Sequence, residues 1–214
     1  MTAAHAQTAV TPTLEVVIAS TRPGRAGEAI GRWAAQSCRE DGRFEVAVTD
    51  LAELALPMMN EPHLPRSRQY VHEHTRVWSR IVDGADALVF VVPEYNHGFP
   101  GGLKNAIDYL HHEWAFKPVG FVSYGGLSGG MRAVQLLKPV LTCLRMIPVT
   151  DQVALANYAE HLKDGEFDPG TPAMTACTLM LDELHRAATA LVGLRLGGIS
   201  VASSEPALAA VRGS

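Results

Sequence analysis

The feature that most constrains this chain is an unbroken apolar run at residues 87–92, Ala-Leu-Val-Phe-Val-Val. Every position in it is apolar, so the segment shows no alternation between a buried face and a solvated face. A strand of this kind is typical of the centre of a parallel sheet, where helices cover both faces. The run therefore predicts an α/β fold built around a buried parallel sheet.

Shorter strand patterns alternate with helical patterns on both sides of this run. We expect strands at residues 14–19, 44–48, 119–123 and 146–149, and apolar helical stripes within residues 30–38, 70–82, 103–114, 133–144 and 174–191. Residues 51–67 contain three prolines and should form an irregular loop, and Pro139 predicts a kink or an early end in its helix. The alternation predicts a flavodoxin-like three-layer sandwich whose five parallel strands follow the order 2-1-3-4-5.

The length of 214 residues fits one domain of ordinary size. We expect that domain to occupy residues 14–192. Residues 1–13 should form a disordered extension and residues 193–214 a flexible tail, because neither end continues the strand and helix patterns.

Composition excludes several classes of protein. Eighteen basic and 22 acidic residues leave a net charge of −4, which argues against a protein that binds nucleic acid through its phosphates. No apolar run approaches 18 residues, so we expect neither a membrane-spanning helix nor a membrane partner. The opening residues lack the pattern of a secretory signal, and the three cysteines are widely spaced and odd in number. These features predict a cytoplasmic protein with reduced thiols.

Three polar, glycine-bearing loops follow the first, third and fourth predicted strands. In the predicted order these strands are neighbours, so the loops should meet in one crevice beyond the carboxyl ends of the sheet. The first loop, residues 20–27, reads Ser-Thr-Arg-Pro-Gly-Arg-Ala-Gly and leads into a helix. Helix-terminal amides, two hydroxyls, Arg22 and Arg25 make it a candidate phosphate site, and the alternative is a solvated turn. It is neither a dinucleotide G-x-G-x-x-G motif nor a Walker loop.

The second and third loops are suited to a flat ligand. The second loop, residues 93–102, reads Pro-Glu-Tyr-Asn-His-Gly-Phe-Pro-Gly-Gly, and its glycines let a planar heterocycle approach the backbone. The third loop, residues 123–130, reads Ser-Tyr-Gly-Gly-Leu-Ser-Gly-Gly. Its glycines indicate either a close approach of the backbone to another group or only a tight turn.

Taken together, these motifs resemble the NAD(P)H-dependent FMN reductase family, with residues 93–108 as the most specific part. The resemblance extends from about residue 14 to about residue 149. It implies a flavodoxin-like domain that binds FMN and accepts electrons from NADPH or NADH. It also implies a homodimer or a tetramer, and two-electron transfer to a quinone, an azo compound, a metal oxyanion or free flavin. Because the flavin carries the redox chemistry, no catalytic side chain is expected.

The resemblance assigns the candidate cofactor-binding residues position by position. Ser20, Arg22 and Arg25 would hold the FMN phosphate, next to Gly27 at the start of the helix. The ring would be bordered by residues 93–98, chiefly through backbone groups, and closed on its other side by the third loop; these residues are Pro93, Glu94, Tyr95, Asn96, His97, Gly98, Ser123, Tyr124, Gly125 and Gly126. The family often has a further Ser or Thr near the end of the first loop. This chain has Ala26 and Gly27 there, and Arg25 is expected to compensate.

Two alternatives come from other functional classes. Residues 126–130 match the G-x-S-x-G elbow of serine hydrolases around Ser128, and Asp151, Asp164, His161 and His185 could complete a triad. A non-enzymatic electron carrier of the flavodoxin type is the second alternative, although such carriers present strongly acidic faces. Both remain open from the sequence.

The histidines and aromatic residues support two further expectations. His72 and His74 lie two positions apart, which on a helix places them on different faces, so no metal site is expected. Tyr109, Leu110 and Trp114 exceed what one helix face buries in a monomer, which suggests pairing of this helix across a two-fold axis.

Overall fold

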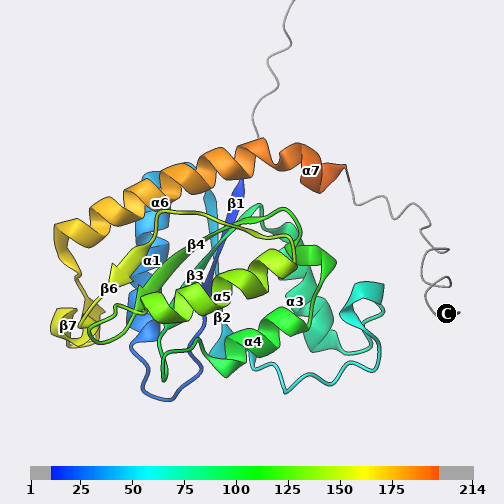
Figure 1. The fold of residues 1–214 in the computed structure, drawn as a ribbon, viewed down its shortest axis with the longest axis horizontal. Coiled ribbons are helices and arrows are strands. Elements are labelled where there is room, and N and C mark those ends of the chain that lie inside the picture. Colours follow the sequence, from blue (N-terminus) through cyan, green and yellow to red (C-terminus); the bar gives the residue numbers. More distant parts are fainter. Residues whose placement is uncertain (1–10, 198–214) are drawn as a thin grey trace, which may run out of the picture.

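A parallel sheet forms the centre of the structure, a computed structural model that describes residues 11–197. Its strands lie in the order β2 (Glu45–Asp50), β1 (Thr13–Ile18), β3 (Ala87–Pro93), β4 (Pro118–Tyr124) and β5 (Ile147–Pro148), and β6 (Val153–Leu155) also pairs with β4 (Figure 1). Each of these strand pairs is parallel. The predicted order 2-1-3-4-5 is confirmed, and β6 is an unpredicted sixth strand.

Helices cover both faces of the sheet. Helices α1 (Gly27–Asp41) and α6 (Gly170–Ala190) pack in one apolar cluster, whereas α3 (Glu73–Gly84), α4 (Gly101–Asp108) and α5 (Met131–Cys143) pack in the other. Alternate residues of β3 belong to the two clusters, with Val89 and Val91 on one side and Phe90 and Val92 on the other. This two-sided burial is the physical reason that the run at residues 87–92 has no polar position.

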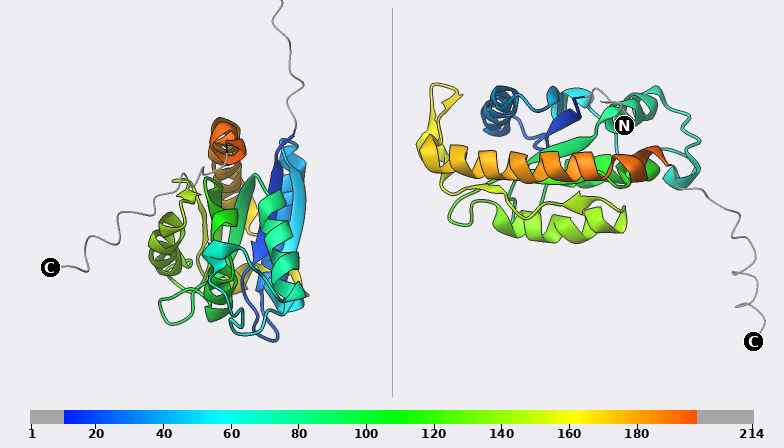
Figure 2. Two further views of the ribbon diagram at one scale, coloured as in Figure 1. Left: turned by 90° about the vertical axis from the view of Figure 1, so that its right-hand side faces the viewer. Right: turned by 90° about the horizontal axis from the view of Figure 1, so that it is seen from above.

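The chain after β6 forms elements that the sequence did not predict. A short helix η3 (Tyr158–His161) leads into an antiparallel hairpin of β7 (Leu162–Lys163) and β8 (Glu166–Phe167). Figure 2 shows α6 starting beside this hairpin and running across the molecule to α7 (Val192–Leu196). The predictions of a disordered extension at residues 1–13 and a flexible tail at residues 193–214 fall mostly on residues outside the described range, although β1 begins at Thr13 and α7 extends to Leu196. Within residues 11–197, no helix is both long enough and apolar enough to span a membrane.

Two helices end where the sequence pattern did not place their ends. Helix α4 stops at Asp108, and residues 112–114 form the separate turn η2 (His112–Trp114). Hydrogen bonds hold the chain in this turn, because the Glu113 carboxylate accepts the His111 amide and also the hydroxyls of Tyr70 and Ser79, and the Trp114 indole donates to the Ile107 carbonyl. Helix α5 continues past Pro139 to Cys143, with the proline on its exposed side, where water can reach the carbonyl that loses its partner.

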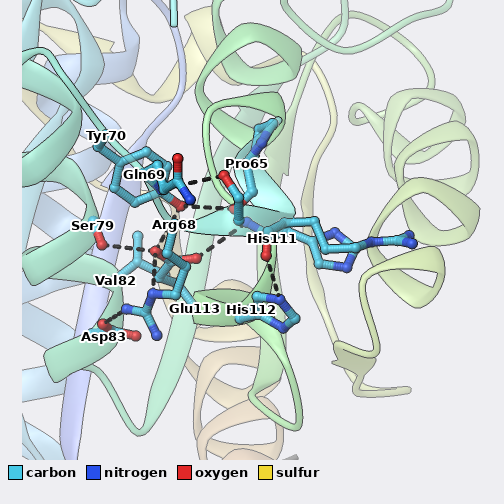
Figure 3. Close-up of polar contacts among 12 residues, drawn as sticks. Pro65, Arg68, Gln69, Tyr70, Ser79, Val82, Asp83, His111, His112 and Glu113 are labelled. Carbon is cyan, nitrogen blue, oxygen red and sulfur yellow. Dashed lines mark hydrogen bonds and ion pairs between the residues drawn. The ribbon is translucent and has the colours of Figure 1, made fainter. Parts of the chain in front are cut away.

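The proline-rich loop, residues 55–72, is anchored by a buried carboxylate. The chain passes from α2 (Leu51–Leu54) through this loop, which contains the turn η1 (Pro65–Ser67). The Glu113 carboxylate, fully buried, accepts hydrogen bonds of 2.8 Å from the hydroxyls of Tyr70 and Ser79, and Arg68 lies 3.3 Å away (Figure 3). The network fastens the loop to α3 and η2.

The same loop covers residues that we expected at an interface between subunits. The Tyr109 hydroxyl donates to Pro57 and Asn60 of the proline-rich loop, and the Trp114 ring packs edge-on against Trp78. Tyr109, Leu110 and Trp114 are therefore buried within a single chain. The premise that these side chains exceed what a monomer buries was wrong.

Candidate functional site

The first, second and third loops meet at the carboxyl edge of the sheet. Strand β1 lies between β2 and β3, and β3 pairs with β4 so that Pro93 stands beside Tyr124. The Ser20 and Tyr95 hydroxyls are 2.7 Å apart, which joins the first loop to the second. The Glu94 amide donates to the Tyr124 carbonyl at 3.0 Å, which joins the second loop to the third. The prediction that the three loops meet at one edge of the sheet is confirmed.

The first loop ends at a helix terminus that has no side-chain cap. Ala26 is the N-cap of α1, and its side chain supplies no acceptor to the first turn. Ile30 is the first residue of α1 whose amide bonds back, to the Ala26 carbonyl, so the amides of residues 27–29 have no partner within the helix. A free helix N-terminus attracts an anion. Within residues 11–197, Arg22 lies exposed on this loop and forms no ion pair.

Gly27 is buried where the first loop touches the third. A Cβ atom at this position would lie 2.6 Å from the Tyr124 hydroxyl oxygen and 3.2 Å from the Ser20 Cβ. Any side chain would therefore displace one of these two residues. The glycine lets the start of α1 approach β4 closely.

Arg25, which was expected to hold the phosphate, is paired with a carboxylate of the protein. Its Nη2 atom forms an ion pair with Asp50, the last residue of β2, and both side chains are largely buried. The other Asp50 oxygen accepts the Ala52 amide at 2.9 Å and caps α2. Asp50 therefore occupies part of the guanidinium that was expected to compensate for the missing hydroxyl near Ala26.

The second loop contains a tight turn with unusual backbone conformations. Tyr95 and Gly98 exchange two backbone hydrogen bonds of 2.9 Å around Asn96 and His97. The φ angles of Asn96 and His97 are 50° and 69°, so both central residues are left-handed, as a type I′ turn requires. The turn presents the exposed side chains of Tyr95, Asn96 and His97 at the rim of the site.

Glu94 fastens the third loop to the second. Its carboxylate accepts hydrogen bonds from the Ser128 hydroxyl at 2.8 Å and from Arg132 Nε at 2.6 Å. Burial works against the charge of Glu94, but the bonds from Arg132 and Ser128 outweigh it and hold the pKa of this carboxyl below its usual value. A charged Glu94 therefore keeps residues 125–130 in place.

Close packing of the chain against itself explains most glycines of the third loop. Gly130, with φ 82°, would place a Cβ 2.7 Å from the Tyr124 nitrogen, and Gly129 lies against residues 154–156. Among the glycines of the third loop, only Gly126 has open space around the position of a Cβ. The sequence left two explanations for these glycines, a close approach to another group and a tight turn, and both apply. The group that Gly129 and Gly130 approach is the chain's own backbone.

The Tyr124 hydroxyl is a buried polar atom without a partner. It lies next to Gly27, and Tyr158 of η3 packs edge-on against its ring at 5.2 Å. Burial raises the pKa of Tyr124, so the phenol remains protonated and neutral. Arg25 Nε is also buried and lacks a partner. Two unused donors beside an uncapped helix start fit a phosphate group.

The hydrolase alternative receives no support from the geometry around Ser128. Within the described residues the partners of this hydroxyl are Glu94 and the Gly130 amide. His185 packs against Phe44 and His161 against Phe167, so neither candidate base is bonded to Ser128. A nucleophilic serine needs a general base within hydrogen-bond reach.

Three residues of this region were not predicted from the sequence: Asp50, Arg132 and Tyr158. Asp50 carried a usable signal, because it lies two residues beyond the strand predicted at residues 44–48, at the carboxyl edge of the sheet where the first loop also begins. Arg132 and Tyr158 carried none, because their contacts to Glu94 and Tyr124 depend on how distant segments fold together. The premise that His72 and His74 lie on different faces of a helix was wrong, since His72 precedes α3 in an extended conformation and the two ring centroids lie 5.1 Å apart in a stacked arrangement.

Comparisons with known proteins show what the chain is similar to. The family model described as NADPH-dependent FMN reductase matches residues 12–160. An NAD(P)H-dependent FMN reductase of Schizosaccharomyces pombe is 39% identical over 162 residues, which are 75% of this chain and 80% of that protein. A quinone reductase of Pseudomonas putida is 35% identical over 113 residues, 47% of this chain and 61% of that protein.

A solved structure shares the fold at low sequence identity. The flavoenzyme NAD(P)H:(acceptor) oxidoreductase FerB of Paracoccus denitrificans superposes with a TM-score of 0.67 at 18% identity. The match covers 84% of this chain and 98% of that one. At this identity the likeness concerns the flavodoxin-like fold.

Proposed function

The chain belongs to the NADPH-dependent FMN reductase family, whose members are enzymes with FMN and NAD(P)H as cofactors, and on this premise we propose that it reduces a small acceptor. Two electrons pass from NAD(P)H through bound FMN to a quinone, an azo compound, a metal oxyanion or free flavin. The Pseudomonas putida relative, named quinone reductase, supports a quinone as acceptor. The observation that carries the proposal is the meeting of the three loops around unused donors at Tyr124, Arg25 and the start of α1.

The chain's own residues bind and orient the cofactor in this proposal. Ser20, Arg22, Arg25 and the amides at the start of α1 hold the phosphate, and the neutral Tyr124 phenol adds a donor. Residues 93–98 border the ring, and residues 123–126 close its other side. FMN, when bound, supplies the capacity to accept a hydride and to pass electrons on, so no side-chain base is required.

We further propose that the electron donor and the acceptor use the same exposed side of the site in turn. The support is the contrast between buried Ser20 and Tyr124 and the exposed rim of Asn96, His97 and Gly126. One open side admits one planar reactant at a time and predicts a ping-pong cycle. Initial rates measured against NADPH at several acceptor concentrations should give parallel double-reciprocal lines, whereas intersecting lines would contradict this order.

We also propose that the chain assembles as a homodimer or a tetramer. The support is a set of exposed apolar side chains at and after the third loop: Leu127, Met131 and Leu136. Sedimentation equilibrium should give a mass of two or four times the 23.0 kDa chain. A mass of 23.0 kDa at micromolar concentration would contradict the proposal.

The visible spectrum of the purified protein tests the proposed function. We expect protein mixed with FMN to retain a yellow flavin through gel filtration or to quench flavin fluorescence, and to lose the yellow colour when NADPH is added. Sustained NADPH oxidation with a quinone, without a partner reductase, separates an enzyme from an electron carrier. Ester hydrolysis that disappears in Ser128→Ala, in a protein that takes up no FMN, would instead support the hydrolase alternative.

A further inference from the structure

Asp50 places a negative charge at the end of the site where a phosphate is expected. It is the last residue of β2 and pairs in register with Ile18 of β1, two residues before Ser20. Its side chain is about 7% exposed and that of Arg25 about 15% exposed, so water screens this ion pair only weakly. The pair joins the first loop to the start of α2.

The cap of α2 does not require the negative charge of Asp50. Capping α2 needs only an oxygen that accepts the Ala52 amide, and Ser, Asn or Asp at this position can supply it. A buried ion pair also contributes little net stability compared with neutral residues that pack well. The negative charge of Asp50 therefore calls for an explanation beyond folding.

The charge has a direct consequence for an anionic ligand. Arg25 Nε is buried without a partner, while Nη2 is engaged by Asp50. A phosphate that binds Arg25 must share the guanidinium with the Asp50 carboxylate. The two negative charges also repel each other. The affinity for riboflavin, which lacks the phosphate, would not depend on this ion pair in the same way.

We propose that Asp50 sets the affinity of the site for the FMN phosphate, holding Arg25 while offsetting its charge so that the cofactor binds weakly enough to exchange. This inference rests on the proposed function, because it takes FMN as the ligand. Asp50 is thus an affinity-determining residue that acts through Arg25. Removal of its charge should tighten FMN binding.

The test is a fluorescence titration of the apoprotein with FMN and, separately, with riboflavin. In Asp50→Asn, we expect the dissociation constant for FMN to fall at least threefold and that for riboflavin to stay unchanged. The gain for FMN should shrink as salt concentration rises, because screening weakens charge interactions. The dissociation rate of FMN should fall with the dissociation constant.

Asp86→Asn is the matched control for charge and substitution. Asp86 also pairs with an arginine, Arg195, at 2.9 Å and accepts a backbone amide, that of Thr13, but it precedes β3 at the opposite edge of the sheet. We expect it to change neither dissociation constant. If Asp50→Asn does not fold, as judged by circular dichroism, Asp50→Ser offers a second uncharged cap for the same comparison.

The outcomes separate this inference from the proposed function. Wild-type protein that binds FMN, with an Asp50→Asn variant that binds FMN equally well or more weakly, overturns the inference and leaves the proposed function standing. An equal change for FMN and riboflavin also overturns it. Wild-type protein that binds neither flavin overturns the proposed function and the inference together.

Discussion

At the scale of single residues, the site contains conformations and polar atoms that folding alone does not favour. Asn96 and His97 adopt positive φ angles, and the Tyr124 hydroxyl is buried without a partner. Strain and unsatisfied groups of this kind concentrate where a protein binds a ligand. Two substitutions measure how much stability the chain gives up at these positions.

His97→Gly should stabilise the protein. The second central position of a type I′ turn favours glycine, and His97 has φ 69° there. We expect the free energy of unfolding in urea to rise by about 0.5–1 kcal/mol. Asn96→Gly is the control and should change stability less, because asparagine tolerates the left-handed region. A loss of stability in His97→Gly would show that the imidazole makes contacts that outweigh the backbone strain.

Tyr124→Phe should move stability and cofactor binding in opposite directions. Removing a buried hydroxyl without a partner should raise the unfolding free energy of the apoprotein by about 1 kcal/mol. The same change should weaken FMN binding, because the phenol is a proposed phosphate donor. Urea unfolding and a flavin titration of the same preparation measure both effects. A lower free energy of unfolding, with unchanged FMN affinity, would contradict this prediction and would assign the hydroxyl a structural role.

At the scale of elements, the strands were predictable and several loops and helix ends were not. The run at residues 87–92 and the alternation around it predicted the sheet order, because a strand that is buried on both faces is apolar at every position. The turn after α4 is held by hydrogen bonds that Glu113 accepts from Tyr70 and Ser79, and the pairing of Arg25 with Asp50 depends on the register of β2 against β1. Such contacts are set by the folded chain, and single-residue patterns do not record them.

Strand β1 contains one acidic residue whose burial predicts a pH dependence of stability. Glu15 is buried, and its Oε1 atom has no partner. Burial raises the pKa of Glu15, although a hydrogen bond from Thr49 opposes the shift. A carboxyl whose pKa is higher in the folded state binds more protons than in the unfolded chain. Its contribution to stability is therefore present below the unfolded pKa and is lost as pH rises through the folded pKa.

Glu15→Gln should remove this pH dependence. We expect the variant to be more stable than the wild type by about 2 kcal/mol at pH 8, where the buried carboxylate is charged, and to lose that advantage near pH 4. Urea unfolding at several pH values measures the difference. Glu45→Gln, an exposed position on the neighbouring strand β2, is the control and should follow the wild type. An advantage that is constant with pH would contradict the role of the charge.

At the scale of the whole molecule, the parallel sheet determines where the site lies. Neighbouring carboxyl ends of β1, β3 and β4 bring residues 20–27, 93–102 and 123–130 to one edge, although these loops are widely separated in sequence. The meeting of these loops at one candidate site was therefore predictable from strand order and polar loops. Its electrostatic balance, with Asp50 against Arg25 and Glu94 against Arg132, was not, because the partners come from other elements.

The most direct test of the central claim is the position of the FMN phosphorus atom in a crystal structure of the protein grown with FMN. The account predicts that it lies at the start of α1, within hydrogen-bond reach of the amides of residues 27–29 or the hydroxyl of Ser20. The ring would then lie between residues 93–98 and 123–126. A phosphate found at any other edge of the sheet, or a flavin bound away from these loops, would contradict the account.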